Sequence, residues 1–182
     1  METTGALARK MEVEARFKSG ARWFFWIAGL SMLNAVLIAS GSSITFVVGL
    51  GATIVVDAVA LHLRQGGGNA TLIIAVSLAI DAFIAGFFVL FGVLALKRNT
   101  GAFVAGMILY AADAALLAWA QDWFSCVFHA LALWFLFSGL QACRQMPAAE
   151  AALSRAVAAD IANTPAAPTA NTPALPAEPG TE

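Results

Sequence analysis

The stretch that decides the fold runs from Thr71 to Leu96 and reads "TLIIAVSLAIDAFIAGFFVLFGVLAL". It is long enough to cross a bilayer as one helix, since a spanning helix needs about 20 predominantly apolar residues. Asp81 is the one charged residue within it. A carboxylate facing lipid at mid-span costs roughly 2.5–3.5 kcal/mol on insertion scales. Asp81 is therefore expected to face the interior of a protein bundle.

The rest of the chain shares this apolar character. Of its 182 residues, 60% are hydrophobic and 12% are charged, whereas soluble domains carry about 25% charged residues. The chain therefore belongs with integral membrane proteins, and the lipid bilayer is its first expected partner. A formal net charge of −1 gives no electrostatic basis for nucleic-acid binding, so nucleic acid is excluded as a partner.

Five apolar runs have the length of a membrane span. The predicted spans are residues 22–40, 43–63, 71–96, 102–121 and 123–143. The first is too long for the core of a cleavable signal peptide and predicts a retained anchor. The last two are separated by so short a turn that they must form an antiparallel hairpin, in which Asp122 caps the fifth helix. The predicted fold is an all-α integral membrane bundle of five transmembrane helices.

Polar segments flank the bundle at both ends. Residues 1–21 predict an amphipathic helix lying at the membrane interface. Residues 144–163 predict a short amphipathic tail helix, with Pro147 suited to its first turn. Residues 164–182 are rich in Pro, Ala and Thr, and such a segment buries too little apolar surface to order itself. We therefore expect a disordered C-terminal tail.

The orientation follows from the positions of basic and aromatic residues. With the N-terminus inside and five spans, the cytoplasmic side carries Arg9, Lys10, Arg16, Lys18, Arg22 and Arg64. The outer side then carries Lys97, Arg98, Arg144 and Arg155. The same arrangement brings four tryptophans to one interface, namely Trp23, Trp26, Trp119 and Trp123. We predict a multi-pass protein of the plasma (inner) membrane with a cytoplasmic N-terminus and an external C-terminus.

Two pairs of predicted spans resemble each other. Residues 27–38 align with 74–85 and match Asn34 to Asp81, while residues 46–61 align with 103–117 and match Asp57 to Asp113. A true repeat would relate helices one and two to helices three and four about an axis along the membrane normal. Apolar helices also resemble one another through composition alone, so both interpretations stay open.

Each predicted span carries one strongly polar residue near mid-depth: Asn34, Asp57, Asp81, Asp113 and His129. A hydroxyl-bearing residue lies one turn earlier on the same face in each case: Ser31, Thr53, Ser77, Tyr110 and Ser125. Three aspartates facing lipid would cost about 8–10 kcal/mol, so they are expected to meet inside the bundle. Because three ionised carboxylates repel one another, such a layer requires a proton, a charged histidine or a cation.

Three functional interpretations of this polar layer remain. The first is proton or cation handling or transport. The second is an accessory or scaffold subunit without chemistry of its own, with a homo-oligomer or another membrane protein as partner, in which the polar residues only join helices. The third, less favoured, is a membrane-embedded metal-dependent enzyme with Asp57, Asp81, Asp113 and His129 as candidate ligands. Neither an HExxH nor a GxSxG motif is present, so no catalytic residue is assigned and no cofactor is indicated.

Overall fold

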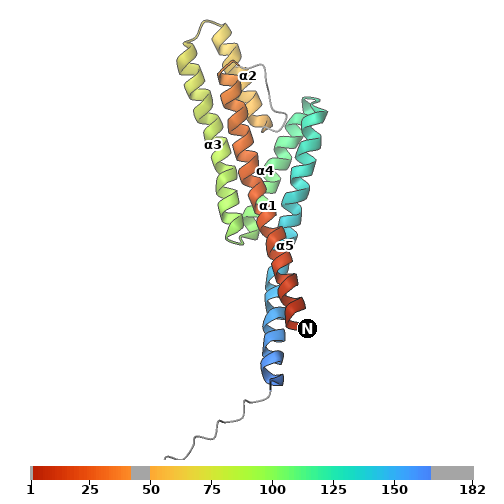
Figure 1. The fold of residues 1–182 in the computed structure, drawn as a ribbon. Helices are drawn as coiled ribbons and strands as arrows, with labels where there is room; N and C mark the ends of the chain where they lie inside the picture. The colour runs from red at the N-terminus through yellow and green to blue at the C-terminus, as the bar shows by residue number, and fades with distance from the viewer. Residues whose placement is uncertain (1, 42–49, 165–182) are drawn as a thin grey trace, which may run out of the picture.

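The computed structural model describes residues 2–41 and 50–164, and these form helices joined by turns (Figure 1). The five helices are α1 (Glu2–Ala39), α2 (Gly51–Gln65), α3 (Ala70–Leu96), α4 (Thr100–Trp119) and α5 (Trp123–Asn163). No strand occurs in the described ranges. The all-helical class expected from the sequence is confirmed.

Four of these helices, α1, α3, α4 and α5, are long and apolar enough to cross a membrane. The exception is α2, which has 15 residues and is therefore about 22 Å long at a rise of about 1.5 Å per residue. A bilayer core is about 30 Å thick, so α2 does not match the expected span 43–63. Its helix begins at Gly51, and residues 42–49 lie outside the described part of the chain. Five spans are not confirmed; four are present by length and composition.

The path of the chain differs from the expected five crossings. In Figure 1, α1 rises from the N-terminus, α3 descends, α4 rises and α5 descends. The short α2 begins inside the bundle and runs out to the same end at which α1 finishes. Because α1 and α3 run in opposite directions, the first two helices are not related to the next two by an axis along the membrane normal. Of the two interpretations left open by the sequence, the structure therefore favours resemblance through composition over a parallel repeat.

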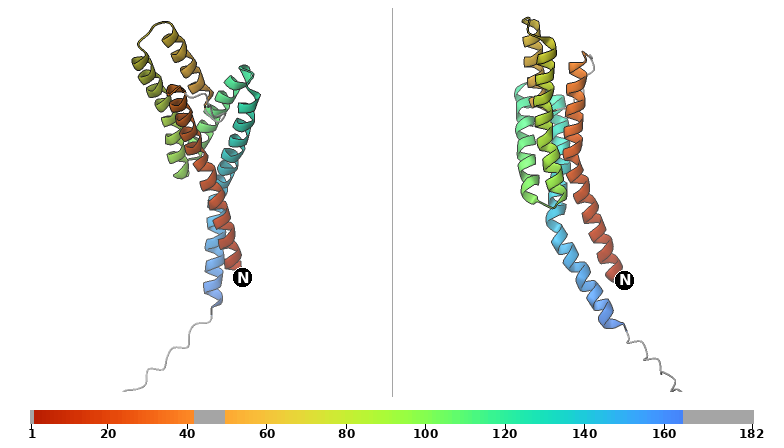
Figure 2. Two further views of the ribbon diagram at one scale, coloured as in Figure 1. Left: turned by 45° about the horizontal axis from the view of Figure 1, so that its top comes forward. Right: turned by 90° about the vertical axis from the view of Figure 1, so that its left-hand side faces the viewer.

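The two ends of the helical body lie together. Thr3 Oγ1 donates a hydrogen bond to the carbonyl oxygen of Ala156 at 3.3 Å, and both views in Figure 2 show the start of α1 beside the end of α5. The expectation that the two ends lie on opposite sides of a membrane rested on an odd number of spans. Four crossings would bring them to the same side instead.

The flanking amphipathic segments are continuations of the outer helices. α1 has 38 residues and α5 has 41, so residues 2–21 and 144–163 extend α1 and α5 beyond the bundle as a pair. Val13 and Met146 are buried in this extension, so residues 2–21 pack against α5 instead of lying at the membrane interface as expected. Pro147 lies inside α5 rather than in its first turn. It lacks the N–H that would bond the carbonyl of Cys143.

The two outer helices cross at a pair of glycines. A Cβ atom placed on Gly20 of α1 would lie 2.4 Å from the Cα of Gly139 on α5. Small residues permit such close backbone approach between helices. Immediately beyond the crossing, the rings of Phe24 and Phe103 pack with centroids 5.7 Å apart. The crossing thus marks the point at which the two-helix extension joins the bundle.

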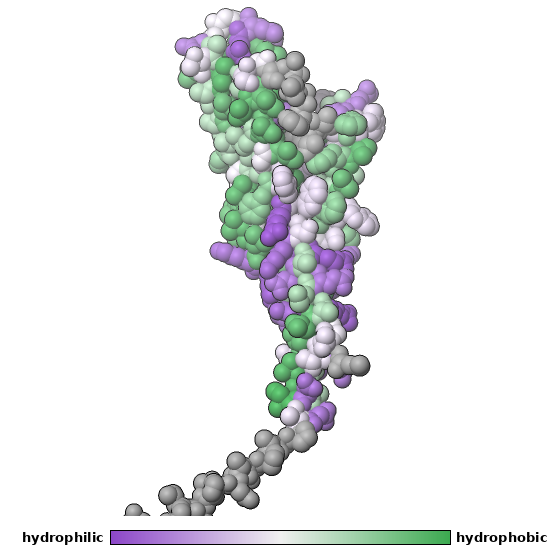
Figure 3. All heavy atoms as spheres, in the orientation of Figure 1, coloured by the Kyte–Doolittle hydropathy of each residue, from purple (hydrophilic) through white to green (hydrophobic). Residues whose placement is uncertain are grey.

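Apolar side chains cover the sides of the bundle, while polar side chains gather at its two ends (Figure 3). Large apolar groups are exposed along its length, such as Phe83 at 68%, Val127 at 70% and Trp134 at 70%. At the end nearer the extension, Arg98 Nη1 contacts Glu150 Oε1 at 2.8 Å and ties the α3–α4 turn to α5. This distribution suits contact with a lipid bilayer.

Asp122 begins α5 as the sequence predicts. Its Oδ1 accepts from the backbone N–H of Ser125 at 3.1 Å, and its Oδ2 accepts from the hydroxyl of Ser125 at 2.6 Å. These hydrogen bonds, led by that of the hydroxyl, lower the pKa of Asp122. Because the pKa is lower in the folded state, the ionised cap stabilises the fold above the ordinary pKa. That stability is lost as pH falls through the folded-state value.

We expect Asp122→Ala to lower the free energy of unfolding by about 1 kcal/mol at neutral pH. The difference from the parent protein should shrink as the cap is protonated in acid. Unfolding in mixed micelles at pH 7 and pH 3 measures this. Asn69→Ala is the control, because Asn69 caps α3 through Leu72 N–H without titrating. Equal pH dependence of the two variants would contradict the expected role of the carboxylate.

Candidate functional site

All ten polar side chains singled out in the sequence are buried. None is more than 7% exposed: Ser31, Asn34, Thr53, Asp57, Ser77, Asp81, Tyr110, Asp113, Ser125 and His129. No other charged or hydroxyl-bearing side chain is buried in the described part of the chain. The structure arranges the ionisable members as two pairs rather than one group, and the N-terminus of α2 is a third polar feature beside them.

The first turn of α2 is held by two other helices. The backbone N–H of Leu50 donates to Ser31 Oγ of α1 at 2.8 Å. The next two N–H groups, of Gly51 and Ala52, donate to Asp113 Oδ2 and Oδ1 of α4 at 2.7 and 2.8 Å. A helix N-terminus exposes unpaired donors and partial positive charge. Since Leu50 provides no side-chain cap, Asp113 supplies the missing acceptors from a different helix.

His129 of α5 completes this pair with Asp113. Its Nε2 lies 3.0 Å from Asp113 Oδ2, and its Nδ1 lies 2.8 Å from the carbonyl oxygen of Ser125. A carbonyl only accepts, so Nδ1 carries a hydrogen. The remaining contact needs one more proton, either on Nε2 or on the carboxyl. Asp113 and His129 therefore share one proton, and the ring of Tyr110 stacks on the imidazole at 4.4 Å and 15°.

The second pair joins α2 to α3. The carboxyl groups of Asp57 and Asp81 lie within hydrogen-bonding reach of each other. Apart from this mutual contact, Asp57 Oδ2 and both oxygens of Asp81 have no hydrogen-bond donor in the described part of the chain. Two carboxylates this close in a nonpolar surrounding repel strongly. A proton held between them would remove the repulsion and would join two of the three oxygens that lack a donor.

The hydroxyl-bearing neighbours do not bond the aspartates on their own helices. Thr53 Oγ1 donates to the Leu50 carbonyl at 2.8 Å, and Ser77 Oγ donates to the Ile74 carbonyl at 3.0 Å. The Tyr110 hydroxyl is buried and finds no partner among the described residues. A position on the same helical face as a polar residue thus predicted that these hydroxyl side chains are buried. It did not predict their hydrogen-bond partners. The hydroxyls of α2 and α3 satisfy themselves within their own helices.

The four candidate metal ligands do not gather at one point. In residues 2–41 and 50–164, no group of three His, Cys, Asp or Glu side chains is placed to hold a metal ion. Two carboxyls from α2 and α3 form one pair, and a carboxyl and an imidazole from α4 and α5 form the other. The metal-enzyme hypothesis finds no support in this geometry, because a protein metal site draws on three or more ligands.

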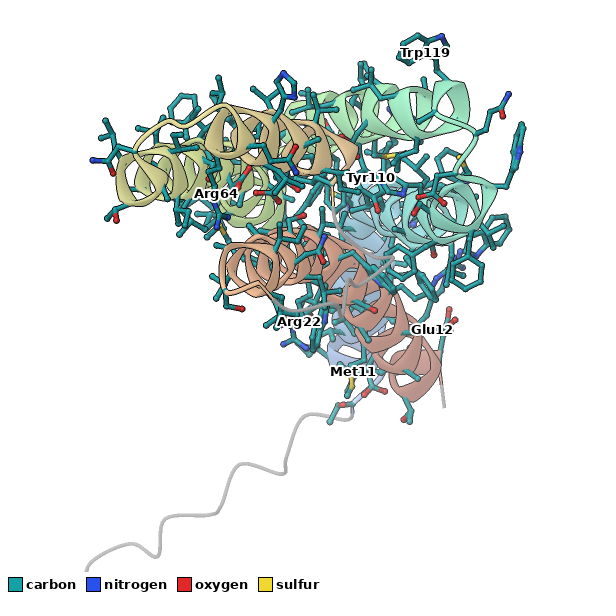
Figure 4. The ribbon with its side chains drawn as sticks, turned by 90° about the horizontal axis from the view of Figure 1, so that it is seen from above. Met11, Glu12, Arg22, Arg64, Tyr110 and Trp119 are labelled. Carbon is teal, nitrogen blue, oxygen red and sulfur yellow. The ribbon has the colours of Figure 1, made fainter. Side chains whose placement is uncertain are left out.

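A hollow of about 780 Å³ between α3 and α4 reaches Asp113 from the outside of the bundle. Its walls are apolar and include Phe83, Phe87 and Ile108. His129 behind it is fully buried. Tyr110 lies in the middle of the bundle in the end-on view of Figure 4. The hollow therefore leads from an apolar face of the bundle to the carboxyl of Asp113.

The backbone N–H donors at the start of α2 belong to the site but were not expected from the sequence. The sequence did contain one signal, namely Gly51 inside the expected span. In the structure, a Cβ at this position would lie 2.9 Å from Leu117 Cγ. A glycine within an apolar run marks a close approach or a break. No protein-family model matches the chain, and neither does any curated protein or solved structure.

Proposed function

We propose that the protein is a multi-pass membrane protein that takes up and releases protons at the Asp57–Asp81 pair. The observation that carries this proposal is the pair itself, in which three carboxyl oxygens inside an apolar bundle have no hydrogen-bond donor among residues 2–41 and 50–164. Ionisable groups at membrane depth are costly and mark proton or ion pathways. Asparagine would join the helices at lower cost, so helix packing alone does not account for two aspartates.

A proton fits the pair better than a metal cation. In the described part of the chain, no third His, Cys, Asp or Glu side chain joins these two carboxyls as a metal ligand. Hard cations take six or more oxygen ligands. Protonation needs only the two carboxyls that are present.

The short α2 supports the same proposal. Discontinuous helices at membrane depth form the ion and substrate sites of many transporters. Gly51, bound to Asp113, and Asp57, facing Asp81, lie about 9 Å apart along α2 at a rise of about 1.5 Å per residue. One short helix therefore connects two pairs that each hold a proton. A change at either pair acts on the position of α2 and so on the other pair.

The same arrangement supports a new orientation, with both helical ends in the cytoplasm. Every Lys and Arg except Arg64 lies on the extension, at the base of α1 or α5, or in the α3–α4 turn. The ion pair of Arg98 with Glu150 keeps that turn at the same end as the extension. Four crossings thus place nearly all basic residues on one side, in agreement with the positive-inside rule.

We expect Asp57→Asn and Asp81→Asn to reduce proton flux into liposomes to the level of protein-free vesicles. The asparagine amide does not ionise at neutral pH. The pair can then no longer take up and release a proton. Flux is measured with an enclosed pH-sensitive dye under an imposed potassium diffusion potential. Asp122→Asn is the matched control, because it removes a carboxylate outside the bundle core. Parent flux equal to that of empty vesicles, or unchanged flux in both core variants, would contradict the proposal.

The two-helix extension favours a second candidate, an accessory subunit that binds another protein. Leu7, Met11 and Ile161 are exposed there at 45%, 62% and 70%. Photo-crosslinking from positions 11 and 161 in native membranes tests it. A stoichiometric partner, together with full biological activity of Asp57→Asn, would favour the accessory role over proton handling.

A further inference from the structure

We propose that the outer face of α1, where it enters the bundle, binds the phosphate headgroup of an anionic glycerophospholipid. A hollow of about 650 Å³ lies along this face. Two cations and one carboxylate are among its walls, which include Glu14, Lys18, Ser19, Arg22, Trp23 and Trp26. Figure 4 shows Arg22 on the outer side of α1, away from the other helices. This surface is separate from both buried pairs and does not depend on proton handling.

The charged groups of the hollow suit a phosphate. Lys18 and Arg22 lie one helical turn apart and project from the same face. Lys18 Nζ contacts Glu14 Oε1 at 2.7 Å, while Arg22 has no carboxylate partner within the described residues. The hollow therefore carries a net positive charge, with a guanidinium free to bind phosphate oxygens in a bidentate manner.

The aromatic groups place this charge at the headgroup level. Arg22 is the last basic residue before the apolar run of α1, and Trp23 follows it directly. The indole of Trp23 is fixed by stacking on Phe135, with centroids 4.7 Å apart and planes 10° apart. Trp26 is 63% exposed one turn further along. Tryptophans prefer the membrane interface, so the acyl chains would follow Trp26 while the phosphate meets Arg22.

Lipid is the expected source of the phosphate because the hollow continues into the apolar surface of the bundle. The basic residues gather at this end of the molecule, which the proposed orientation assigns to the cytoplasmic leaflet, where anionic lipids attract such clusters. A free phosphate would use the charge of Lys18 and Arg22 but gain nothing from the exposed indole of Trp26. Charge and aromatic contact together favour the lipid.

Brominated lipids test the proposal through quenching of tryptophan fluorescence. In a variant with Trp119→Phe, Trp123→Phe and Trp134→Phe, the tryptophan fluorescence comes from Trp23 and Trp26 alone. In phosphatidylcholine vesicles, we expect brominated phosphatidylglycerol to quench these two at lower mole fraction than brominated phosphatidylcholine does. Lys18→Gln with Arg22→Gln should weaken that preference about tenfold or more, since each basic residue near the surface contributes about 1 kcal/mol.

Arg9→Gln with Arg16→Gln is the matched control, because it removes the same charge from exposed positions outside the hollow. It should leave the preference intact. Equal loss in both double variants would overturn the proposal in favour of a diffuse charge effect, and so would the absence of any preference in the parent. Displacement of the brominated lipid by millimolar inorganic phosphate would show a free-anion site and would also overturn it.

Discussion

Asp113→Ala should be among the most destabilising single substitutions in the chain, lowering the free energy of unfolding by about 3–5 kcal/mol. The carboxylate accepts from the N–H groups of Gly51 and Ala52 and contacts His129. Its removal leaves the N–H groups of Gly51 and Ala52 and Nε2 of His129 without their partner, while Nδ1 of His129 keeps the Ser125 carbonyl. Unfolding by SDS in mixed micelles, followed by tryptophan fluorescence, measures the loss.

A second measurement separates this role from a general loss of packing. Hydrogen exchange at the amides of Gly51 and Ala52 should accelerate in Asp113→Ala while α3 stays protected, because the substitution frees the first turn of α2. In a double-mutant cycle, adding His129→Ala should cost much less than it does alone, since its partner is already gone. A decrease of less than about 1 kcal/mol in the free energy of unfolding for Asp113→Ala would contradict the expected role of Asp113. Additive effects of the two substitutions in the cycle would contradict it as well.

Gly139→Ala and Gly20→Ala should each lower the free energy of unfolding by about 1–3 kcal/mol. A Cβ on either glycine would meet the backbone of the opposing helix, at 2.4 Å from Gly20 and 2.6 Å from Gly139. Backbone cannot move aside as a flexible side chain does, so α1 and α5 must separate. The same micelle titration measures this loss. The larger side chain of Gly139→Leu should lower the free energy of unfolding further than Gly139→Ala does.

Gly29→Ala provides the control for the crossing. Gly29 lies in the same helix α1, and a Cβ there meets nothing within 4 Å. Because alanine favours helix over glycine, this variant should equal the parent or exceed it in stability. If Gly29→Ala were as destabilising as Gly20→Ala, the close contact at the crossing would not be the cause of the loss in Gly20→Ala.

Apolar run length was enough to predict the all-helical class, and α3 illustrates why. Its run from Thr71 to Leu96 is nearly the observed helix Ala70–Leu96, since Asn69 caps one end and a polar turn follows the other. The burial of Asp81 also follows from the sequence, because a carboxylate is costly in lipid. This cost predicts that the side chain is buried but does not identify its partner.

The path through α2 was not predictable in the same way. Residues 43–63 have the apolar content of a span, and hydropathy does not record where a helix begins within such a run. The start at Gly51 depends on Ser31 and Asp113, which lie far away in the sequence and come together only in the folded bundle. One crossing fewer would reverse both the expected direction of α3 and the side expected for the C-terminal end of α5.

The dependence of α2 on Asp113 has a consequence for biogenesis. Gly51 and its acceptor are 62 residues apart, so when α2 leaves the ribosome its acceptor has not yet been synthesised. Unbonded amide groups are poorly tolerated within the hydrocarbon core. During translation, α2 must therefore wait in the aqueous vestibule of the insertion machinery or at the bilayer surface. It can take its final place only after α4 has entered the membrane.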